Sequence, residues 1–373
     1  MERLIVVGSG IVGSACAYAA SGLGADVILV DSDGTGRATS AGAGIISPWS
    51  SMVDDPHWHD MARSAARAYP ALIGALAEDG ETALGYRQVG ALVLTETAEQ
   101  QREISQRLLA RQPEWPEMGD IDALGPEEAG KLFPPLRPDF SAVRIGGAAR
   151  VDGRLISAAL RRAAGRGGTT VIPGEATLRC AGGVVTGVTV AGEFLAADAV
   201  VAATGAWTDQ FLKPAGITLG VTPQRGQIVH FGLGMTDTSR WPAILPGGTG
   251  HYMLAFDDSR VVAGATRETG SGFDYRVTPG GLAEVLNQAL AIAPGLASGT
   301  YLETRIGFRP MGPGIRPLVG AVPGVEGLVV ATGLGASGLT MGPYAGELAA
   351  RAALGASLPM DLYPFRPVPA SSQ

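Results

Sequence analysis

Lysine is almost absent from this 373-residue chain, which contains only Lys131 and Lys213. Arginine therefore carries nearly all of the positive charge, and 28 basic residues against 35 acidic ones give a formal net charge of -7. Binding to nucleic-acid phosphates depends on clustered basic side chains. The charge balance therefore argues against a nucleic-acid partner.

Cysteine is equally scarce. Cys16 and Cys180 form neither a CxxC pair nor a spacing that would bind a metal, and Cys16 falls within an expected buried helix. A disulfide framework is not expected. Chains of this kind belong by default to a reducing compartment, so we expect a cytoplasmic protein.

The chain also lacks a long uninterrupted hydrophobic run. The apolar stretch from Leu4 to Val30 is broken by five glycines and by Asp26, so it does not read as a membrane span. The N-terminus MERLIVVGSG has no basic region followed by an apolar run and a cleavage site, which argues against a secretory signal.

Two common catalytic motifs, GxSxG and GxxxxGK, are missing as well. The cluster from Asp54 to Asp60 contains His57 and His59, but two residues so spaced on a helix point apart. Asp-Asp-Pro is an ordinary way to begin a helix. We expect no metal site.

The chain does contain a large apolar fraction, 46%, and a length that suits two domains at about 100–200 residues each. Residues 4–7 and 25–30 read as buried parallel strands around a helix over 11–23, which together form a βαβ unit. Further helices are expected over 57–80, 99–112, 152–164, 279–292 and 339–354. Residues 34–48 read as a loop, and residues 176–200 as short antiparallel strands.

The βαβ unit carries a dinucleotide-binding pattern. Gly8, Gly10 and Gly13 form GxGxxG between the first strand and the helix, and Asp31 ends the second strand. The glycines allow a tight turn, a close approach of pyrophosphate and close packing of the helix, and Asp31 can accept hydrogen bonds from ribose. The unit by itself does not separate NAD from FAD.

A second glycine turn near the C-terminus favours FAD. The apolar strand 327–331 leads through Thr332 and Gly333 to Ser337 and Gly338, where the last helix begins. Its N-terminal dipole can stabilise negative charge on a reduced flavin. A glycine cap and a tight packing turn would give the same pattern.

Several ordered segments resemble the family of FAD-dependent glycine oxidases and D-amino-acid oxidases and dehydrogenases (the DAO family). The resemblance covers nearly the whole chain and rests on these segments, as they stand in the sequence: GRATSAGAGI (36–45), ATGAW (203–207), PQRGQ (223–227), HY (251–252), GATRE (264–268), GFRP (307–310) and PLVG (317–320).

The resemblance implies an α/β fold with a Rossmann-like FAD-binding domain, of the p-hydroxybenzoate-hydroxylase and glutathione-reductase type, and a β-rich α+β substrate domain. The expected FAD-binding domain comprises residues 1–46, 140–212 and 305–373. The expected substrate domain comprises 47–139 and 213–304. Non-covalent FAD is expected, because no cysteine lies near Arg309 and no histidine lies within 36–46.

The resemblance also implies the site residues. Arg309 would pair with a substrate carboxylate, Tyr252 would donate to the same group, and Arg267 would bind an acidic substrate group or point to solvent. The expected cofactor-binding residues are Gly8, Gly10, Ile11, Val12, Gly13, Asp31, Ser32, Arg37, Thr39, Ser40, Ala43, Gly44, Ile45, Ala176, Thr204, Gly205, Trp207, Arg309, Gly333, Gly335, Ala336, Ser337, Gly338, Leu339 and Thr340.

The resemblance thus implies an oxidoreductase that takes a hydride from the carbon next to the nitrogen of a small amino acid, such as a D-amino acid or glycine. Arg267, and Ala336 where some glycine oxidases carry arginine, put glycine itself in doubt. Oxidation of a secondary amine such as proline or an N-methyl amino acid, a non-catalytic FAD-binding subunit and an NAD enzyme are the alternatives. Oxygen or an electron carrier would reoxidise the flavin, and the oligomeric state is open.

Overall fold

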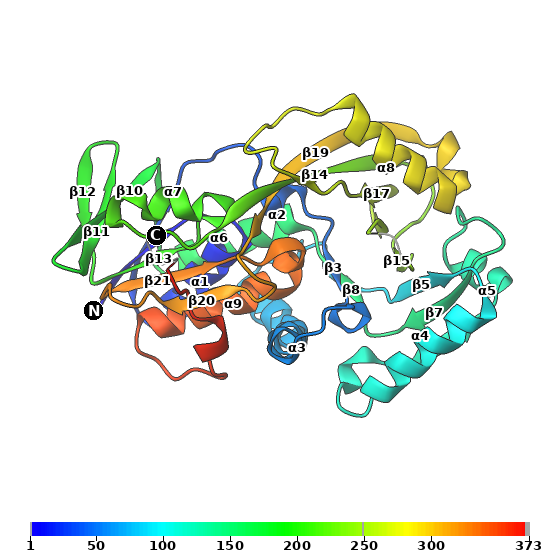
Figure 1. Cartoon of the computed structure of the whole chain (residues 1–373), viewed down its shortest axis with the longest axis horizontal. Helices are drawn as coiled ribbons and strands as arrows, with labels where there is room; N and C mark the ends of the chain where they lie inside the picture. Colours follow the sequence, from blue (N-terminus) through cyan, green and yellow to red (C-terminus); the bar gives the residue numbers. More distant parts are fainter. Residues whose placement is uncertain (1, 248–249, 370–373) are drawn as a thin grey trace.

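The computed structural model describes residues 2–247 and 250–369 and is a mixed α/β fold built around two large sheets (Figure 1). The first is six-stranded and holds the N-terminal strand at its centre. Its order is β20 (Leu318–Ala321), β21 (Leu328–Thr332), β13 (Ala199–Ala202), β1 (Arg3–Val7), β2 (Asp26–Asp31) and β9 (Thr170–Pro173). Only β20 runs antiparallel to its neighbour.

Both faces of this sheet are buried, which explains why its strands read as continuous apolar runs. Leu4 and Val6 of β1 pack toward helices, while Ile5 and Val7 belong to a separate cluster on the other face. The helices are α1 (Ile11–Gly22), α3 (Pro56–Glu78), α6 (Gly153–Arg166) and α9 (Gly338–Ala353). The other face is covered by β10 (Ala176–Ala181), β11 (Val184–Val190), β12 (Glu193–Ala196) and α7 (Thr208–Leu212).

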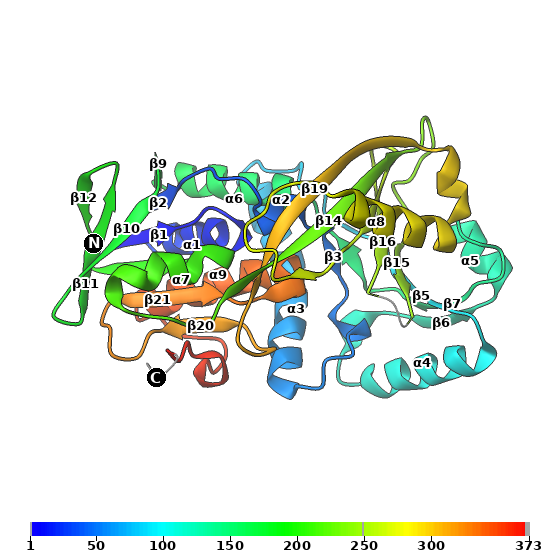
Figure 2. The ribbon, with the colours of Figure 1, turned by 45° about the horizontal axis from the view of Figure 1, so that its top comes forward.

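The second large sheet is nine-stranded and lies beside the first (Figure 2). It contains β18 (Glu268–Thr269), β14 (Thr222–Gly232), β17 (Arg260–Gly264), β16 (Tyr252–Phe256), β15 (Ala243–Pro246), β5 (Ala91–Thr95), β7 (Ser141–Ile145), β6 (Ile121–Leu124) and β19 (Thr300–Met311). Three helices accompany it: α4 (Ala98–Arg111), α5 (Pro126–Leu132) and α8 (Pro279–Ile292).

The long antiparallel pair of β14 and β19 runs from one half of the molecule to the other (Figure 1). Thr222 pairs with Met311 at the end nearest the six-stranded sheet, and Gly232 pairs with Thr300 at the far end. Residues on β19 such as Arg309 are therefore held between the two halves. The Rossmann-like fold with an added sheet domain agrees with the expected fold class.

The sheet pairing bears on the domain division. β7 pairs with β5 and β6 in the nine-stranded sheet, although the expected division assigned residues 140–212 to the nucleotide half. We therefore propose that this piece begins after Ile145. The remaining boundaries stay a prediction.

One local expectation was wrong. Residues 34–48 are more ordered than a loop, because they contain the short helix α2 (Ala38–Ala41) and the strand β3 (Ile45–Ile46). β3 pairs with β8 (Ala149–Arg150), which also pairs with β4 (Arg87–Gln88). Long-range pairing with β8, which local composition does not encode, gives this segment its structure.

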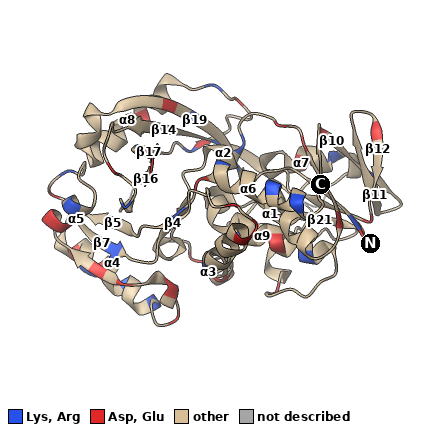
Figure 3. Ribbon diagram, turned by 180° about the vertical axis from the view of Figure 1, so that it is seen from behind, with Lys and Arg blue, Asp and Glu red and all other residues tan. Residues whose placement is uncertain are grey.

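Basic and acidic residues are interspersed over both halves when the molecule is seen from behind (Figure 3). In the described part of the chain, no helix combines the length and the apolar character that crossing a bilayer requires. Cys16 is buried in α1, as expected.

Candidate active site

One large cavity of about 1060 Å³ lies where the two sheets meet. The six-stranded sheet contributes the carboxyl ends of its strands, among them Val7, Asp31 and Thr332. The nine-stranded sheet contributes Tyr252 and Arg309. Ligands of open α/β sheets bind outside the carboxyl ends of the strands, so this cavity is the candidate active site.

The GxGxxG turn forms one wall of the cavity. Gly8 has a φ of +100°, and a Cβ added there would lie 2.4 Å from the carbonyl oxygen of Ala203. A Cβ added at Gly13 would lie 1.7 Å from the carbonyl oxygen of Gly8. These contacts bring the N-terminus of α1 up to the cavity, where its first amides have no partner within the helix and can bind phosphate.

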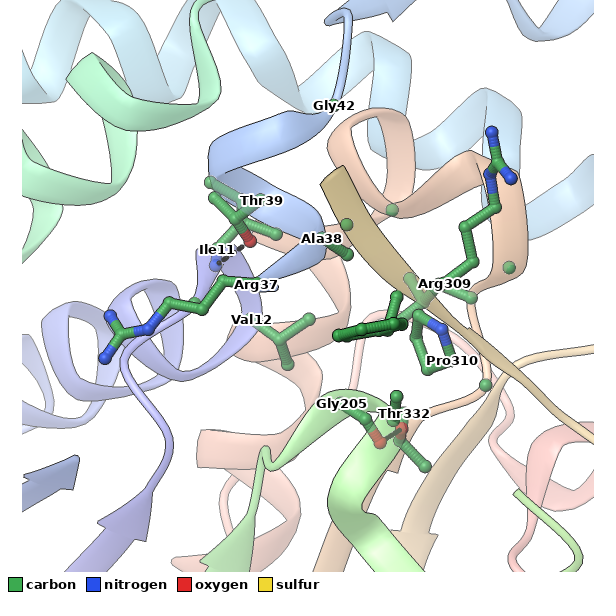
Figure 4. A pocket seen from close by; sticks show the side chains of 18 of the residues that line it. Ile11, Val12, Arg37, Ala38, Thr39, Gly42, Gly205, Arg309, Pro310 and Thr332 are labelled. Carbon is green, nitrogen blue, oxygen red and sulfur yellow. Dashed lines mark hydrogen bonds between the residues drawn. The ribbon is translucent and has the colours of Figure 1, made fainter. Parts of the chain in front are cut away.

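Thr39 fixes this end of α1 from another part of the chain. Its Oγ1 accepts a hydrogen bond of 2.9 Å from the amide of Ile11, which Figure 4 shows as a dashed line. The segment of α2 is thereby joined to the dinucleotide turn. Local sequence gives no signal for this contact, because the two residues are 28 positions apart.

Asp31 ends β2 at the same wall. Its carboxylate accepts a hydrogen bond from Ser9 and forms an ion pair of 2.8 Å with Nη2 of Arg37. Arg161 of α6 donates to the carbonyl oxygen of Ser9 over 3.1 Å. Burial, with the charge of Arg37, lowers the pKa of Arg161. The sequence prediction did not include Ser9 or Arg161.

The second glycine turn forms another part of the wall, and its helix packs against α1. Gly333 and Gly335 have φ values of +71° and +52°, and α9 begins at Gly338 after a short 3₁₀ turn. The Thr332 hydroxyl donates a 2.9 Å hydrogen bond to the carbonyl oxygen of Gly205, which joins the ends of β21 and β13 (Figure 4). A second helix N-terminus is thus aimed at the cavity.

These features fit FAD. Close glycine contacts leave the backbone accessible to pyrophosphate, Asp31 offers a carboxylate to a ribose, and two helix N-termini meet one large cavity. Gly44 adds a further close approach, since a Cβ there would lie 1.8 Å from the carbonyl oxygen of Val151.

The structure brings nearly all of the predicted cofactor-binding residues together around the cavity. Only Gly13 and Ser40 do not line it. Gly13 packs α1 onto the Gly8 turn, and the carbonyl oxygen of Ser40 accepts a 3.1 Å hydrogen bond from Arg154. Trp207 lines the cavity and stacks on Phe273 with ring centroids 4.8 Å apart. Which of these residues touch the cofactor stays a prediction.

Arg309 lies at the other end of the cavity from Arg37 (Figure 4). Its Nη1 donates to the carbonyl oxygen of Thr266 over 2.9 Å and to Gln224 over 3.3 Å. A Cβ at Gly226 would lie 2.8 Å from the guanidinium, so this glycine makes room for it. Among the described residues, no carboxylate lies within ion-pair distance of Arg309.

Tyr252 faces the same region from the start of β16. Burial raises the pKa of its hydroxyl, while the charges of Arg309 and Arg267 oppose that rise. Burial lowers the pKa of Arg309, with a further contribution from Arg267. Arginine stays protonated, so this end of the cavity presents positive charge and a hydroxyl donor.

A buried polar network supports the Arg309 site from behind. Glu268 accepts from Nη2 of Arg225 at 2.5 Å, from Gln227 at 2.7 Å and from the Thr266 hydroxyl at 2.7 Å. Burial works against ionisation of Glu268, but these donors hold its pKa below the usual value. The network fixes Thr266, whose carbonyl oxygen holds Arg309.

No group of three histidine, cysteine or carboxylate side chains in residues 2–247 and 250–369 is placed to hold a metal ion. His59 instead contacts the carbonyl oxygen of Val53 at 2.7 Å, and its ring lies tilted against that of Trp115 with centroids 5.4 Å apart. The Asp54–Asp60 cluster has a helix-start role at Asp55, which accepts from the amide of Trp58.

A family model described as FAD dependent oxidoreductase matches residues 3–352. Two of the similar proteins match almost the whole chain. The uncharacterized oxidoreductase YurR of Bacillus subtilis is 46% identical over 368 residues, which are 98% of this chain and 99% of YurR. A glycine oxidase of Pseudomonas aeruginosa is 29% identical over 371 residues, which are 98% of each chain.

Among solved structures, the chain is similar to the iminodiacetate oxidase IdaA from Chelativorans sp. BNC1. The TM-score is 0.95 at 46% sequence identity, and the match covers 98% of this chain and 99% of IdaA. The likeness therefore extends over both sheets of the fold.

Proposed function

Because the chain belongs to the DAO family of FAD-dependent oxidoreductases, we propose that it oxidises the C–N bond of a small amino acid whose nitrogen is a secondary amine. Iminodiacetate, the substrate in the name of the 46% identical structure, is the first candidate. Glycine, from the name of the 29% identical relative, is the second.

The observation that carries this proposal is the Arg309 guanidinium, half-buried in the cavity without a carboxylate partner among the described residues. A buried charge is costly unless it is paired, and guanidinium binds a carboxylate through two parallel hydrogen bonds. The Tyr252 hydroxyl adds a third donor nearby. A substrate carboxylate completes this arrangement.

Bound FAD supplies the acceptor for a hydride from the carbon next to the nitrogen. The residues of the chain hold the substrate in place: Arg309 and Tyr252 bind its carboxylate and so fix the position of the neighbouring carbon. The nitrogen lone pair forms the C=N bond as the hydride leaves, and water then hydrolyses the imine to an oxo acid and an amine.

The amine must lose its proton before it reacts, and among the described lining residues none is a base for this at the substrate end. The acidic residues that line the described cavity are Asp31 and Glu175, both of which lie near the dinucleotide turn. Burial keeps Tyr252 protonated, and arginine is no base at neutral pH. The substrate therefore reacts as the neutral amine that is present in solution.

The test is an anaerobic titration of the purified yellow holoenzyme with iminodiacetate, N-methylglycine, glycine, proline and D-alanine. Bleaching of the visible flavin bands by the secondary amines is the expected result. Bleaching by glycine or D-alanine alone would shift the assignment to primary amino acids. A flavin reduced by dithionite but by none of these compounds would refute amine oxidation and favour a non-catalytic subunit. Admission of air afterwards separates an oxidase from a dehydrogenase.

Glu268→Gln tests the network behind Arg309. An amide nitrogen would face the donors of Arg225, Gln227 or Thr266, so Thr266 is expected to shift and to release Arg309. Loss of a charge-assisted hydrogen bond costs about 1.5–3 kcal/mol, which corresponds to a KM raised roughly 10- to 100-fold. The measurement is steady-state kinetics with flavin content. Glu303→Gln, outside the cavity, is the control, and an unchanged KM in Glu268→Gln would contradict the positioning role.

A further inference from the structure

Arg267 is a second arginine of the cavity that has no acidic partner among the described residues. It lies between β17 and β18, lines the cavity and is exposed, so it sits toward the entrance. A Cβ at Gly250 would lie 1.4 Å from its Nη1, so the absence of a side chain at this glycine leaves room for the guanidinium. In the described part of the chain, no carboxylate is within ion-pair distance of it.

Arg267 acts on the same region as Arg309. Its charge contributes to lowering the pKa of Arg309 and opposes the rise in the pKa of Tyr252. Two guanidinium groups therefore face one end of the cavity, and neither is neutralised by a described acidic residue. Glu284 of α8 lies 3.4 Å from His251 but not within ion-pair distance of Arg267.

Two like charges at one end of a cavity repel each other, and one substrate carboxylate compensates only one of them. A dianion compensates both. The two arginines also differ in burial: Arg309 is half-buried within the cavity and Arg267 is exposed at its edge. They thus suit two carboxylates at the inner and outer ends of one short molecule.

We propose that Arg267 binds a second carboxylate, and that the preferred substrates are iminodicarboxylic acids, which carry one carboxylate on each side of a secondary nitrogen. This inference rests on the proposed function. The carboxylate next to the oxidised carbon lies on Arg309 and Tyr252, and the one beyond the nitrogen lies on Arg267. The C–H bond of the inner carbon breaks, its hydride goes to FAD, and hydrolysis of the imine gives an oxo acid and a primary amino acid. For iminodiacetate these products are glyoxylate and glycine.

The test compares Arg267→Gln with the unaltered holoenzyme on iminodiacetate and on N-methylglycine. Both substrates are secondary amines, and N-methylglycine lacks the second carboxylate. We expect Arg267→Gln to lose about 10- to 100-fold in kcat/KM on iminodiacetate, as for a charge-assisted hydrogen bond, and to change little on N-methylglycine. Arg267→Lys should restore part of the loss because it keeps the charge but not the fork.

A second readout does not depend on turnover. Oxydiacetate has an ether oxygen in place of the nitrogen, so it cannot react, and its binding is followed through the flavin spectrum. Arg267→Gln should weaken the binding of oxydiacetate roughly 10- to 100-fold. The binding of methoxyacetate, which has one carboxylate, should be unaffected. Arg67→Gln is the matched control, because Arg67 is exposed, pairs with Glu117 and does not line the cavity.

The outcomes separate the two proposals. If Arg267→Gln lowers kcat/KM equally on iminodiacetate and N-methylglycine, or leaves it unchanged on both, the second carboxylate site is overturned while amine oxidation stands. If no amine reduces the flavin but oxydiacetate binds in a way that requires Arg267, the proposed function fails and the dicarboxylate site stands.

Discussion

Arg309→Gln is expected to lose nearly all amine oxidation while it keeps its flavin. Truncating one partner of a buried, hydrogen-bonded charge pair costs about 2–5 kcal/mol, or roughly 30-fold to several thousand-fold in kcat/KM. Arg309 lies at the other end of the cavity from Arg37, where its guanidinium donates to Thr266 and Gln224 and lies beside the Tyr252 hydroxyl. Its loss therefore affects the substrate far more than the cofactor.

The measurement is steady-state kinetics on the secondary amines, together with the visible flavin absorbance per protein. Arg309→Lys keeps the charge but loses the planar fork, so its kcat/KM should lie between those of the unaltered enzyme and Arg309→Gln. The effect should appear with N-methylglycine as well as with iminodiacetate, which distinguishes it from that of Arg267→Gln. Activity of Arg309→Gln within a few-fold of the unaltered enzyme would remove Arg309 from the site.

Local patterns in the sequence predict the nucleotide half well. The strand before Gly8, the helix after it and Asp31 at the end of the next strand all lie within one short βαβ unit. Each is determined by neighbours in the chain: apolar runs for buried strands and glycines where the backbone turns. The glycine turn before α9 is predicted for the same reason.

Contacts between distant segments could not be predicted from such patterns. The Thr39 side chain that holds the amide of Ile11, and Arg161 on the carbonyl of Ser9, join residues far apart in the sequence. Composition identified 34–48 only as rich in glycine, serine and alanine, whereas pairing with β8 makes part of it a strand. The pairing of β7 with β5 and β6 is likewise a contact between distant segments, and local composition does not indicate it.

The residues at the substrate end of the cavity could be predicted only in part. No periodicity indicates that Arg309, Arg267 and Tyr252 share a cavity, because they lie on separate segments of a nine-stranded sheet. Their grouping was predicted only through resemblance to a family. The structure shows how the neighbouring motifs support Arg309. Gly226 makes room for its guanidinium. Arg225, Gln227 and Glu268 form the network that fixes Thr266, whose carbonyl oxygen accepts a hydrogen bond from Arg309.

Gly13→Ala is expected to abolish FAD binding and to destabilise the fold. By helix propensity alone alanine should stabilise α1 by about 1 kcal/mol relative to glycine. The new Cβ would instead lie 1.7 Å from the carbonyl oxygen of Gly8 and 3.2 Å from the Cβ of Ala203. The first of these is backbone and has no rotamer to change, so α1 must move away from β1 and β13.

Gly22→Ala is the matched control in the same helix, because nothing lies within 4 Å of a Cβ added there. The changes in stability caused by the two substitutions should therefore have opposite signs. Gly22→Ala should keep its flavin and unfold at the same temperature or slightly higher, whereas overpacking at Gly13 costs about 1–3 kcal/mol or more. Thermal unfolding and flavin content of both proteins measure this difference. A Gly13→Ala protein that is as yellow and as stable as Gly22→Ala would mean that contact of α1 with the Gly8 turn does not determine how close the phosphates approach.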